Sequence, residues 1–118
     1  MSETTQNRWQ GREMKRRRLE EPSGWLYLTK NDHAQLLIDA LIDGHPDSFN
    51  KSELADFAGV SRDVVHDHLD LLVELGVAAD AGRGDRSRYR FDPESRVSEC
   101  ILEMDAAVQE ARGESRSN

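Results

Sequence analysis

The sequence predicts a mainly α-helical domain with one small β-hairpin, an α+β class with little sheet, followed by a further helix. Apolar residues recur at three- and four-residue spacing in three segments between residues 34 and 75, which is the period of an amphipathic helix. Glycines at positions 44, 59 and 76 follow these segments, as glycines often do at helix ends. Residues 89–91, Tyr-Arg-Phe, alternate apolar and charged side chains, which is typical of a strand.

Composition divides the chain into three parts. Residues 1–24 are polar, lack a hydrophobic period and end in Glu-Glu-Pro-Ser-Gly, so we predict a flexible basic N-terminal arm. Its basic residues are Lys15, Arg16, Arg17 and Arg18. These residues either contact the minor groove or backbone of DNA or belong to a tail that has no binding role. Residues 25–92 are predicted to form the folded domain. Residues 93–118 are predicted to hold a helix over about 93–112 and a disordered tail.

Local signals set the bounds of the first two helices. Thr29 is suited to cap the first helix, with Asp32 near its positive end, and Gly44 is suited to end it. Asn50 and Glu53 have the spacing of a capping box, which predicts the start of the second helix. The second helix is expected to turn three apolar side chains inward: Leu54, Phe57 and Ala58.

The third helix is predicted to begin after Ser61, a good N-cap, and to run to Leu75. One side of it is apolar: Val64, Val65, Leu69, Leu71, Leu72, Val73 and Leu75. The opposite side is polar and mostly acidic: Asp63, His66, Asp67, Asp70 and Glu74. Two short strands are expected next, joined by the glycine- and arginine-rich loop AGRGDRS.

The last helix is predicted to open at Asp92-Pro93-Glu94, with Asp92 as the N-cap. Its apolar residues recur at spacings of four and three, as in a heptad seam: Val97, Ile101, Met104, Val108 and Ala111. This seam either packs on its own domain or pairs with a second copy of the chain. We favour pairing, because the helix follows the hairpin and is expected to project from the domain.

The overall charge is acidic but unevenly distributed. The chain holds 23 acidic and 16 basic residues, and only three of the basic residues are lysine. Such a composition is typical of a salt-loving archaeon, although a GC-rich genome also favours arginine. Residues 82–92 depart from the trend, with four arginines against two aspartates. A single cysteine and the lack of a long apolar run favour a soluble protein of the reducing cytoplasm.

The order of helix, short helix, glycine turn, helix and hairpin is that of a winged helix-turn-helix. The segment SELADFAGVSRDVVHDHLDLLVELGVA, with the loop GRGDRSRYRF, resembles the core of the ArsR-like superfamily of transcription regulators. LTKNDHAQLLIDAL is similar to the first helix of small haloarchaeal and viral repressors of this type. The resemblance covers about residues 25–92.

The resemblance implies a sequence-specific transcription regulator that binds double-stranded DNA, and we expect it to form a homodimer through the last helix. It places five residues at the groove-facing start of the recognition helix: Ser61, Arg62, Asp63, His66 and Asp67. It places three arginines of the wing on the phosphate backbone: Arg83, Arg86 and Arg88. Metal sensors of the ArsR type carry cysteines in or just before the recognition helix, and none is present there, so sensing of that kind is not expected.

The acidic helix face leaves a second hypothesis open, namely a protein-binding winged helix that docks on a basic partner. Three considerations favour DNA. Only Asp63 is acidic in the first turn, where base reading usually occurs, and Arg62 balances it. Carboxylates can accept from the cytosine amino group. In molar salt the screening length falls to about 3 Å, which removes most of the repulsion.

Other chemistry has little support in the sequence. His68 falls in the apolar arc and is expected to be a core histidine with a satisfied ring. Cys100 is expected to be a small buried hydrophobe, and the alternative is an intersubunit disulfide. His66 lies among the carboxylates of Asp63, Asp67 and Asp70 on the third helix, but one histidine with carboxylates is weak evidence for a metal site. No nucleophile–base arrangement or phosphate loop is evident, so we predict no catalysis, no cofactor, no small-molecule ligand and no membrane association.

Overall fold

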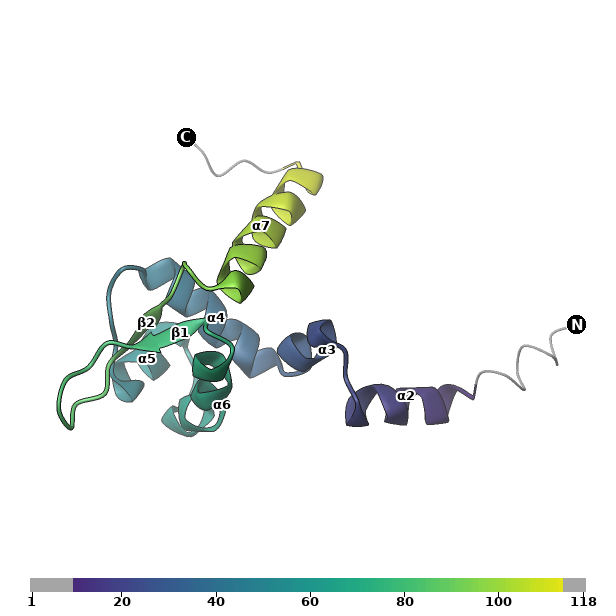
Figure 1. Cartoon of the computed structure of the whole chain (residues 1–118), viewed down its shortest axis with the longest axis horizontal. Coiled ribbons are helices and arrows are strands. Elements are labelled where there is room, and N and C mark those ends of the chain that lie inside the picture. Colours follow the sequence, from purple (N-terminus) through teal and green to yellow (C-terminus); the bar gives the residue numbers. More distant parts are fainter. Residues whose placement is uncertain (1–9, 114–118) are drawn as a thin grey trace, which may run out of the picture.

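The computed structural model describes residues 10–113. It holds a helical body, a two-stranded hairpin and two helices that project from the body, as Figure 1 shows. In chain order the elements are α2 (Gly11–Glu20), α3 (Gly24–Thr29), α4 (Asp32–Gly44), α5 (Lys51–Ala58), α6 (Arg62–Glu74), β1 (Ala78–Asp80), β2 (Tyr89–Phe91) and α7 (Arg96–Ala111). The predicted tail beyond residue 113 and the first nine residues of the arm lie outside the described residues.

The core lies where α4, α5 and α6 pack against one another and against the hairpin. The largest side chains in it are fully buried: Leu37, Leu41, Leu54, Val65, Leu69, Leu72, Val77 and Phe91. Most of these residues belong to the apolar spacing that predicted the helices, so the predicted mainly α class with a small hairpin is confirmed. Burying a side chain of this size contributes about 1.5–3 kcal/mol in transfer free energy.

The N-terminal part of the folded domain differs from the prediction. Residues 24–29 form a separate helix, α3, whose N-cap Ser23 accepts a hydrogen bond from the Leu26 amide. Helix α4 begins at Asp32, and its N-cap is Asn31, whose side chain accepts from the His33 amide. The prediction that Thr29 caps this helix is therefore wrong. The Thr29 hydroxyl instead donates to the Trp25 carbonyl within α3.

The helix-turn-helix itself follows the prediction closely. Asn50 and Glu53 form the predicted capping box of α5, and Ser61 caps α6 by accepting from the Val64 amide. Gly59 takes the left-handed conformation (φ 79°) that the tight turn between the helices requires. Phe57 is the exception, since its side chain is 48% exposed and does not turn fully inward.

The hairpin is the predicted wing, and it is tied to the helical body. β1 and β2 are antiparallel, with Ala78 opposite Phe91 and Asp80 opposite Tyr89. Phe49, in the loop before α5, exchanges two backbone hydrogen bonds of 2.8 Å with Tyr89. The base of the wing is thereby fixed against the start of α5, while its tip extends away from the body (Figure 1).

The last helix starts later than predicted. Its N-cap is Ser95, and the Asp92 carboxylate instead accepts from the Glu94 amide in a local turn. Val97 and Ile101 of the predicted seam pack against the core, whereas Met104 and Val108 are 42% and 48% exposed. The seam therefore packs on its own domain only over its first half, and Ala111 is also exposed.

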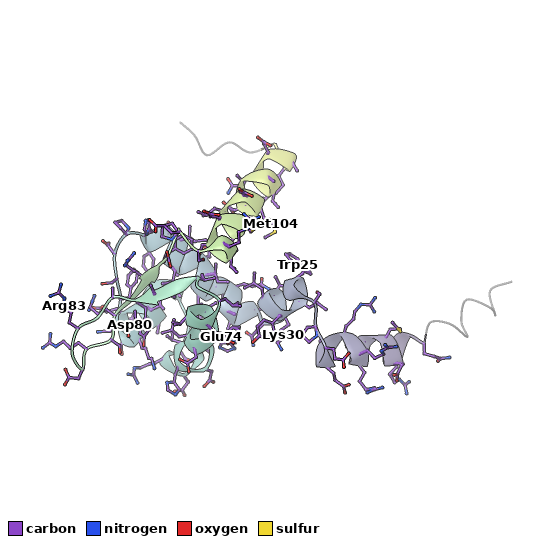
Figure 2. All side chains as sticks on the ribbon, in the orientation of Figure 1. Trp25, Lys30, Glu74, Asp80, Arg83 and Met104 are labelled. Atoms are coloured by element: carbon purple, nitrogen blue, oxygen red, sulfur yellow. The ribbon has the colours of Figure 1, made fainter. Side chains whose placement is uncertain are left out.

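One further expectation is wrong, because Cys100 is exposed on α7 and is not a buried hydrophobe. Within the segment that was predicted to be a flexible arm, residues 11–20 form helix α2. No side chain of α2 is buried, and the helix stands away from the domain in Figure 2, so local interactions between its own charged residues support it.

Substitution of Gly76 tests the backbone conformation at the end of α6. Gly76 has φ 84°, and an added Cβ would lie 2.9 Å from the Ser95 Cβ. We expect Gly76→Ala to lower the free energy of unfolding by more than about 1 kcal/mol, because both backbone strain and contact oppose the methyl group. Gly24 is the matched control, because nothing lies within 4 Å of its added Cβ. Urea denaturation that gives equal losses for Gly76→Ala and Gly24→Ala would contradict this account.

Candidate nucleic-acid interface

The start of α6 presents the side chains that the sequence assigned to base reading. Ser61, Arg62 and Asp63 are exposed, and so are His66 and Asp67 one turn further on. All five predicted residues therefore lie on one accessible side of a helix whose buried side is fixed by the core. A helix about 10–12 Å across matches the width of the DNA major groove.

A notch of about 360 Å³ lies between the start of α5, the start of α6 and the wing. Its lining brings together residues from three segments: Asn50, Lys51, Ser52, Arg62, Asp85, Ser87 and Tyr89. Lys51 and Arg62 supply two cations against one carboxylate, that of Asp85, and the N-terminal end of α5 adds the partial positive charge of the helix dipole. Together these groups suit an anionic oxygen such as a DNA phosphate.

Sequence reasoning missed Lys51, Ser52 and Ser87 in this notch. These residues belong to the capping region of α5 and to the wing, and only the fold brings them beside Arg62. Lys51 also reaches α6 directly, since its Nζ lies 3.1 Å from Nδ1 of His66. The lysine carried no motif that would have indicated this role.

The wing arginines do not form one set. Arg83 and Arg86 lie at the exposed tip, where they are paired across a tight turn that includes Gly84 (φ 64°). Figure 2 shows Arg83 at the far end of the hairpin. Both residues are exposed at the tip of the hairpin.

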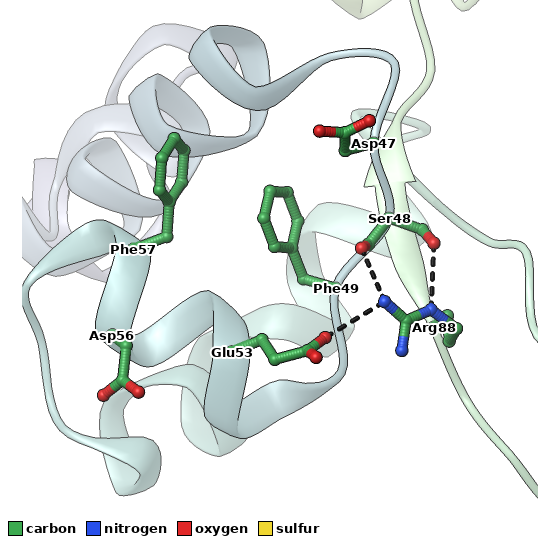
Figure 3. A pocket seen from close by; sticks show the side chains of 7 residues that line it. All are labelled: Asp47, Ser48, Phe49, Glu53, Asp56, Phe57 and Arg88. Atoms are coloured by element: carbon green, nitrogen blue, oxygen red, sulfur yellow. Dashed lines mark hydrogen bonds and ion pairs between the residues drawn. The ribbon is translucent and has the colours of Figure 1, made fainter.

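Arg88 has a different position from the one the resemblance implied. Its guanidinium donates to the Ser48 hydroxyl (3.0 Å), to the Ser48 carbonyl (2.8 Å) and to the Glu53 carboxylate (3.0 Å) (Figure 3). These bonds join the base of the wing to α5. Arg88 therefore positions the wing, and its charge is balanced within the domain.

The pKa of Glu53 is lowered from its ordinary value. The main cause is the hydrogen bond that the carboxylate accepts from the Asn50 backbone amide in the capping box. The nearby positive charge of Arg88 lowers the pKa further. The ionised form of Glu53 therefore stabilises both the start of α5 and the attachment of the wing.

The acidic side of α6 is fully accessible. Asp63, Asp67 and Asp70 are exposed, and within residues 10–113 none of them forms a salt bridge. In that same part of the chain, no group of three or more potential ligands is arranged to hold a metal ion. The side of α6 that is exposed to solvent is therefore lined by carboxylates that have no cationic partner within residues 10–113.

The structure also places His68 and the four basic residues of the arm. His68 is partly buried, and its Nδ1 lies 2.8 Å from the Val64 carbonyl, so the prediction of a satisfied histidine is confirmed. The arm residues Lys15, Arg17 and Arg18 are exposed on α2, whereas Arg16 pairs with Glu13 and Glu20 of the same helix. In Figure 1, α2 lies on the opposite side of the body from the wing.

The arrangement matches known structures but no known sequence family. No protein-family model and no curated protein sequence matches the chain. The chain is similar to NolR from Sinorhizobium fredii, with 22% identity and a TM-score of 0.58 over 86% of this chain and 94% of that one. It is also similar to the AntR antimony-specific transcriptional repressor, with 20% identity and a TM-score of 0.56 over 75% and 76%. At this level of identity the likeness establishes the fold, which is a winged helix-turn-helix.

Of the helices that the structure describes, none combines the length and the apolar character needed to cross a membrane.

The lowered pKa of Glu53 predicts a pH effect on stability. Its stabilising contribution is complete above the unfolded pKa of about 4.3 and is lost as the pH falls through the folded value. We therefore expect the stability difference between the native protein and Glu53→Gln to be larger at pH 7 than at pH 3. Urea denaturation at the two pH values measures it. Glu103→Gln, which changes an exposed carboxylate of α7, is the control, and an equal pH response of the two variants would refute the assignment.

Proposed function

We propose that this protein is a sequence-specific, DNA-binding transcription regulator that acts as a homodimer. The notch between α5, α6 and the wing is the observation that supports it best, because Lys51 and Arg62 meet a helix N-terminus there in an otherwise acidic domain. The likeness in fold to a transcriptional repressor, AntR, agrees with this function.

In the proposed complex α6 lies in the major groove and reads base edges with its first two turns. Arg62 is suited to a guanine, because its guanidinium can donate two parallel hydrogen bonds. Asp63 and Asp67 are suited to accept from the amino group of cytosine. Ser61 and His66 complete the accessible set on this side of the helix.

In the proposed complex, phosphate contacts come from the notch, from the wing tip and from the arm. The notch holds one phosphate through Lys51, Ser52 and the α5 amides, and Arg83 and Arg86 at the wing tip hold others. The arm residues Lys15, Arg17 and Arg18 contribute contacts from α2, which has no buried side chain to restrain it. Such contacts carry most of the affinity and little of the specificity.

The C-terminal helix is the proposed dimer surface. Met104 and Val108 are large apolar side chains that remain 42% and 48% exposed, and Trp25 of α3 is 59% exposed. Figure 2 labels Met104 on α7 and Trp25 on α3. Pairing of two copies across these side chains would place two α6 helices on successive turns of DNA, about 34–36 Å apart.

The antimony specificity named for AntR does not transfer to this chain. Binding of a soft metalloid favours several thiolates, and Cys100 is the only cysteine of the sequence. It is exposed on α7.

Two arginine variants test the division between affinity and specificity. Arg86→Ala should weaken binding to all duplexes and reduce the salt slope by about one unit, because one phosphate contact is lost. Arg62→Ala should cost about 1–3 kcal/mol on the preferred sequence and less on random DNA. Fluorescence anisotropy at several salt concentrations measures both.

Arg96→Ala, at the exposed start of α7, is the control and should bind like the native protein. Equal losses for Arg62→Ala on the preferred and on random DNA would contradict its base-reading role.

The exposed carboxylates of α6 support a second candidate function, a module that docks on a basic protein. Asp67→Asn with Asp70→Asn separates the two candidates, because removing negative charge from a groove-facing helix lowers its repulsion by phosphate. We expect DNA affinity to rise in the double variant, most of all at low salt. A fall in DNA affinity, or none measurable at any salt, would favour the protein-binding function.

The dimer surface predicts the effect of a charge on α7. Met104→Glu should convert the dimer into a monomer, since a carboxylate would have to lose its water at the interface. Leu102→Glu is the matched control, because Leu102 is 36% exposed and points away from the seam around the helix. Analytical ultracentrifugation should show a dimer for the native chain and for Leu102→Glu, and a monomeric native chain would contradict the proposal.

A further inference from the structure

A second depression lies at the base of the wing and takes no part in the proposed contact with DNA. It has a volume of about 690 Å³ and is bounded by the loop before α5, by α5 itself and by the start of β2. We call it the aromatic groove, and its main residues are Asp47, Phe49, Glu53, Asp56, Phe57 and Arg88 (Figure 3).

Two aromatic rings form the apolar part of the groove. Phe49 and Phe57 are stacked, with their centroids 5.2 Å apart and their planes at 17°. Gly44 makes room for them, since a Cβ at this position would lie 2.6 Å from Cζ of Phe49. The pair therefore packs closely against the backbone at Gly44, and yet Phe57 remains 48% exposed at the surface of a polar domain.

The charged residues around the two rings determine which kind of side chain the groove can bind. Three carboxylates, those of Asp47, Glu53 and Asp56, line the groove against a single cation, Arg88. The guanidinium of Arg88 already donates to Ser48 and Glu53, so it does not offer a free positive charge. The faces of aromatic rings also attract cations through their quadrupole. Rings and carboxylates together favour a cationic side chain and repel a polyanion.

The groove and the DNA-facing notch are separate. Successive residues of a strand point to opposite faces, and here Arg88 lines the groove whereas Tyr89 lines the notch. An occupant of the groove therefore leaves the notch and the exposed side of α6 accessible.

We propose that the aromatic groove is a docking site for a basic, arginine-bearing segment of a partner protein. A guanidinium is planar and stacks on an aromatic ring while it donates to nearby carboxylates, which is the combination that Phe57, Asp47 and Asp56 offer. This site goes beyond the proposed binding of DNA and would operate whether or not the chain binds DNA.

The test uses the full chain and the peptide acetyl-Gly-Arg-Gly-Arg-Gly-amide, followed by NMR of the backbone amides without DNA. We expect saturable shifts centred on Phe49, Asp56 and Phe57. The same peptide with citrulline in place of arginine keeps the shape and removes the charge, and it should bind at least about fivefold more weakly.

Two variants test the groove residues. Phe57→Leu keeps an apolar side chain and removes the ring face, so the affinity for the arginine peptide should fall about two- to fivefold. Asp56→Asn should also weaken binding, whereas Glu103→Gln, which removes the same charge from α7, should not. The amide spectra show directly whether each variant is folded.

Three outcomes would overturn the proposal. One is an absence of shifts in the groove with the folded native chain, and another is equal binding of the arginine and citrulline peptides. The third is a set of chemical-shift changes at the groove residues that appears without peptide, grows with protein concentration and vanishes when Lys15, Arg17 and Arg18 are replaced by Gln. In that case the occupant of the groove would be α2 of a second copy of the chain.

Discussion

The attachment of the wing to α5 is the constraint on which the proposed interface depends. Two backbone hydrogen bonds join Phe49 to Tyr89, and Arg88 adds three side-chain bonds to Ser48 and Glu53. Because the capping box at Asn50 fixes Glu53 and the start of α5 together, the wing, α5 and the notch form one unit. Without this attachment the wing would be held only by the packing of β1 against α6 and of β2 against α4.

The protein then faces an electrostatic conflict at the surface of α6. Its exposed carboxylates are unpaired within the described chain, whereas the cations that suit phosphate lie in the notch and at the wing tip. The proposed solution separates the two charges in space, with the cations at the edges of the interface and the carboxylates towards the base edges. Screening by salt then weakens the remaining repulsion more than the direct contacts, because the repulsion acts over longer distances.

The sequence predicted the elements whose signals are local. Periodic apolar residues gave α4, α5 and α6, and the capping residues Asn50 and Ser61 gave the starts of α5 and α6. The errors at Thr29 and Asp92 arose because another capping residue, Asn31 or Ser95, stood a few residues further on. Helix α2 was missed because its charged pairs stabilise a helix without an apolar stripe.

The candidate site could be predicted only in part from the sequence. The exposed residues of α6 followed from helical spacing, but the notch joins segments that lie far apart in the chain. Arg88 could not be distinguished from Arg83 and Arg86 by composition, because its partner Ser48 lies forty residues earlier. Long-range contacts of this kind are set by packing of the whole domain.

The central claim is that this winged helix reads DNA sequence as a dimer, and selection from a random duplex library tests it most directly. The selection should be run in parallel at low and at molar potassium chloride with the folded full chain. The account predicts an enriched inverted repeat with half-sites about 10 base pairs apart that persists in molar salt. No enrichment at either salt concentration would contradict it.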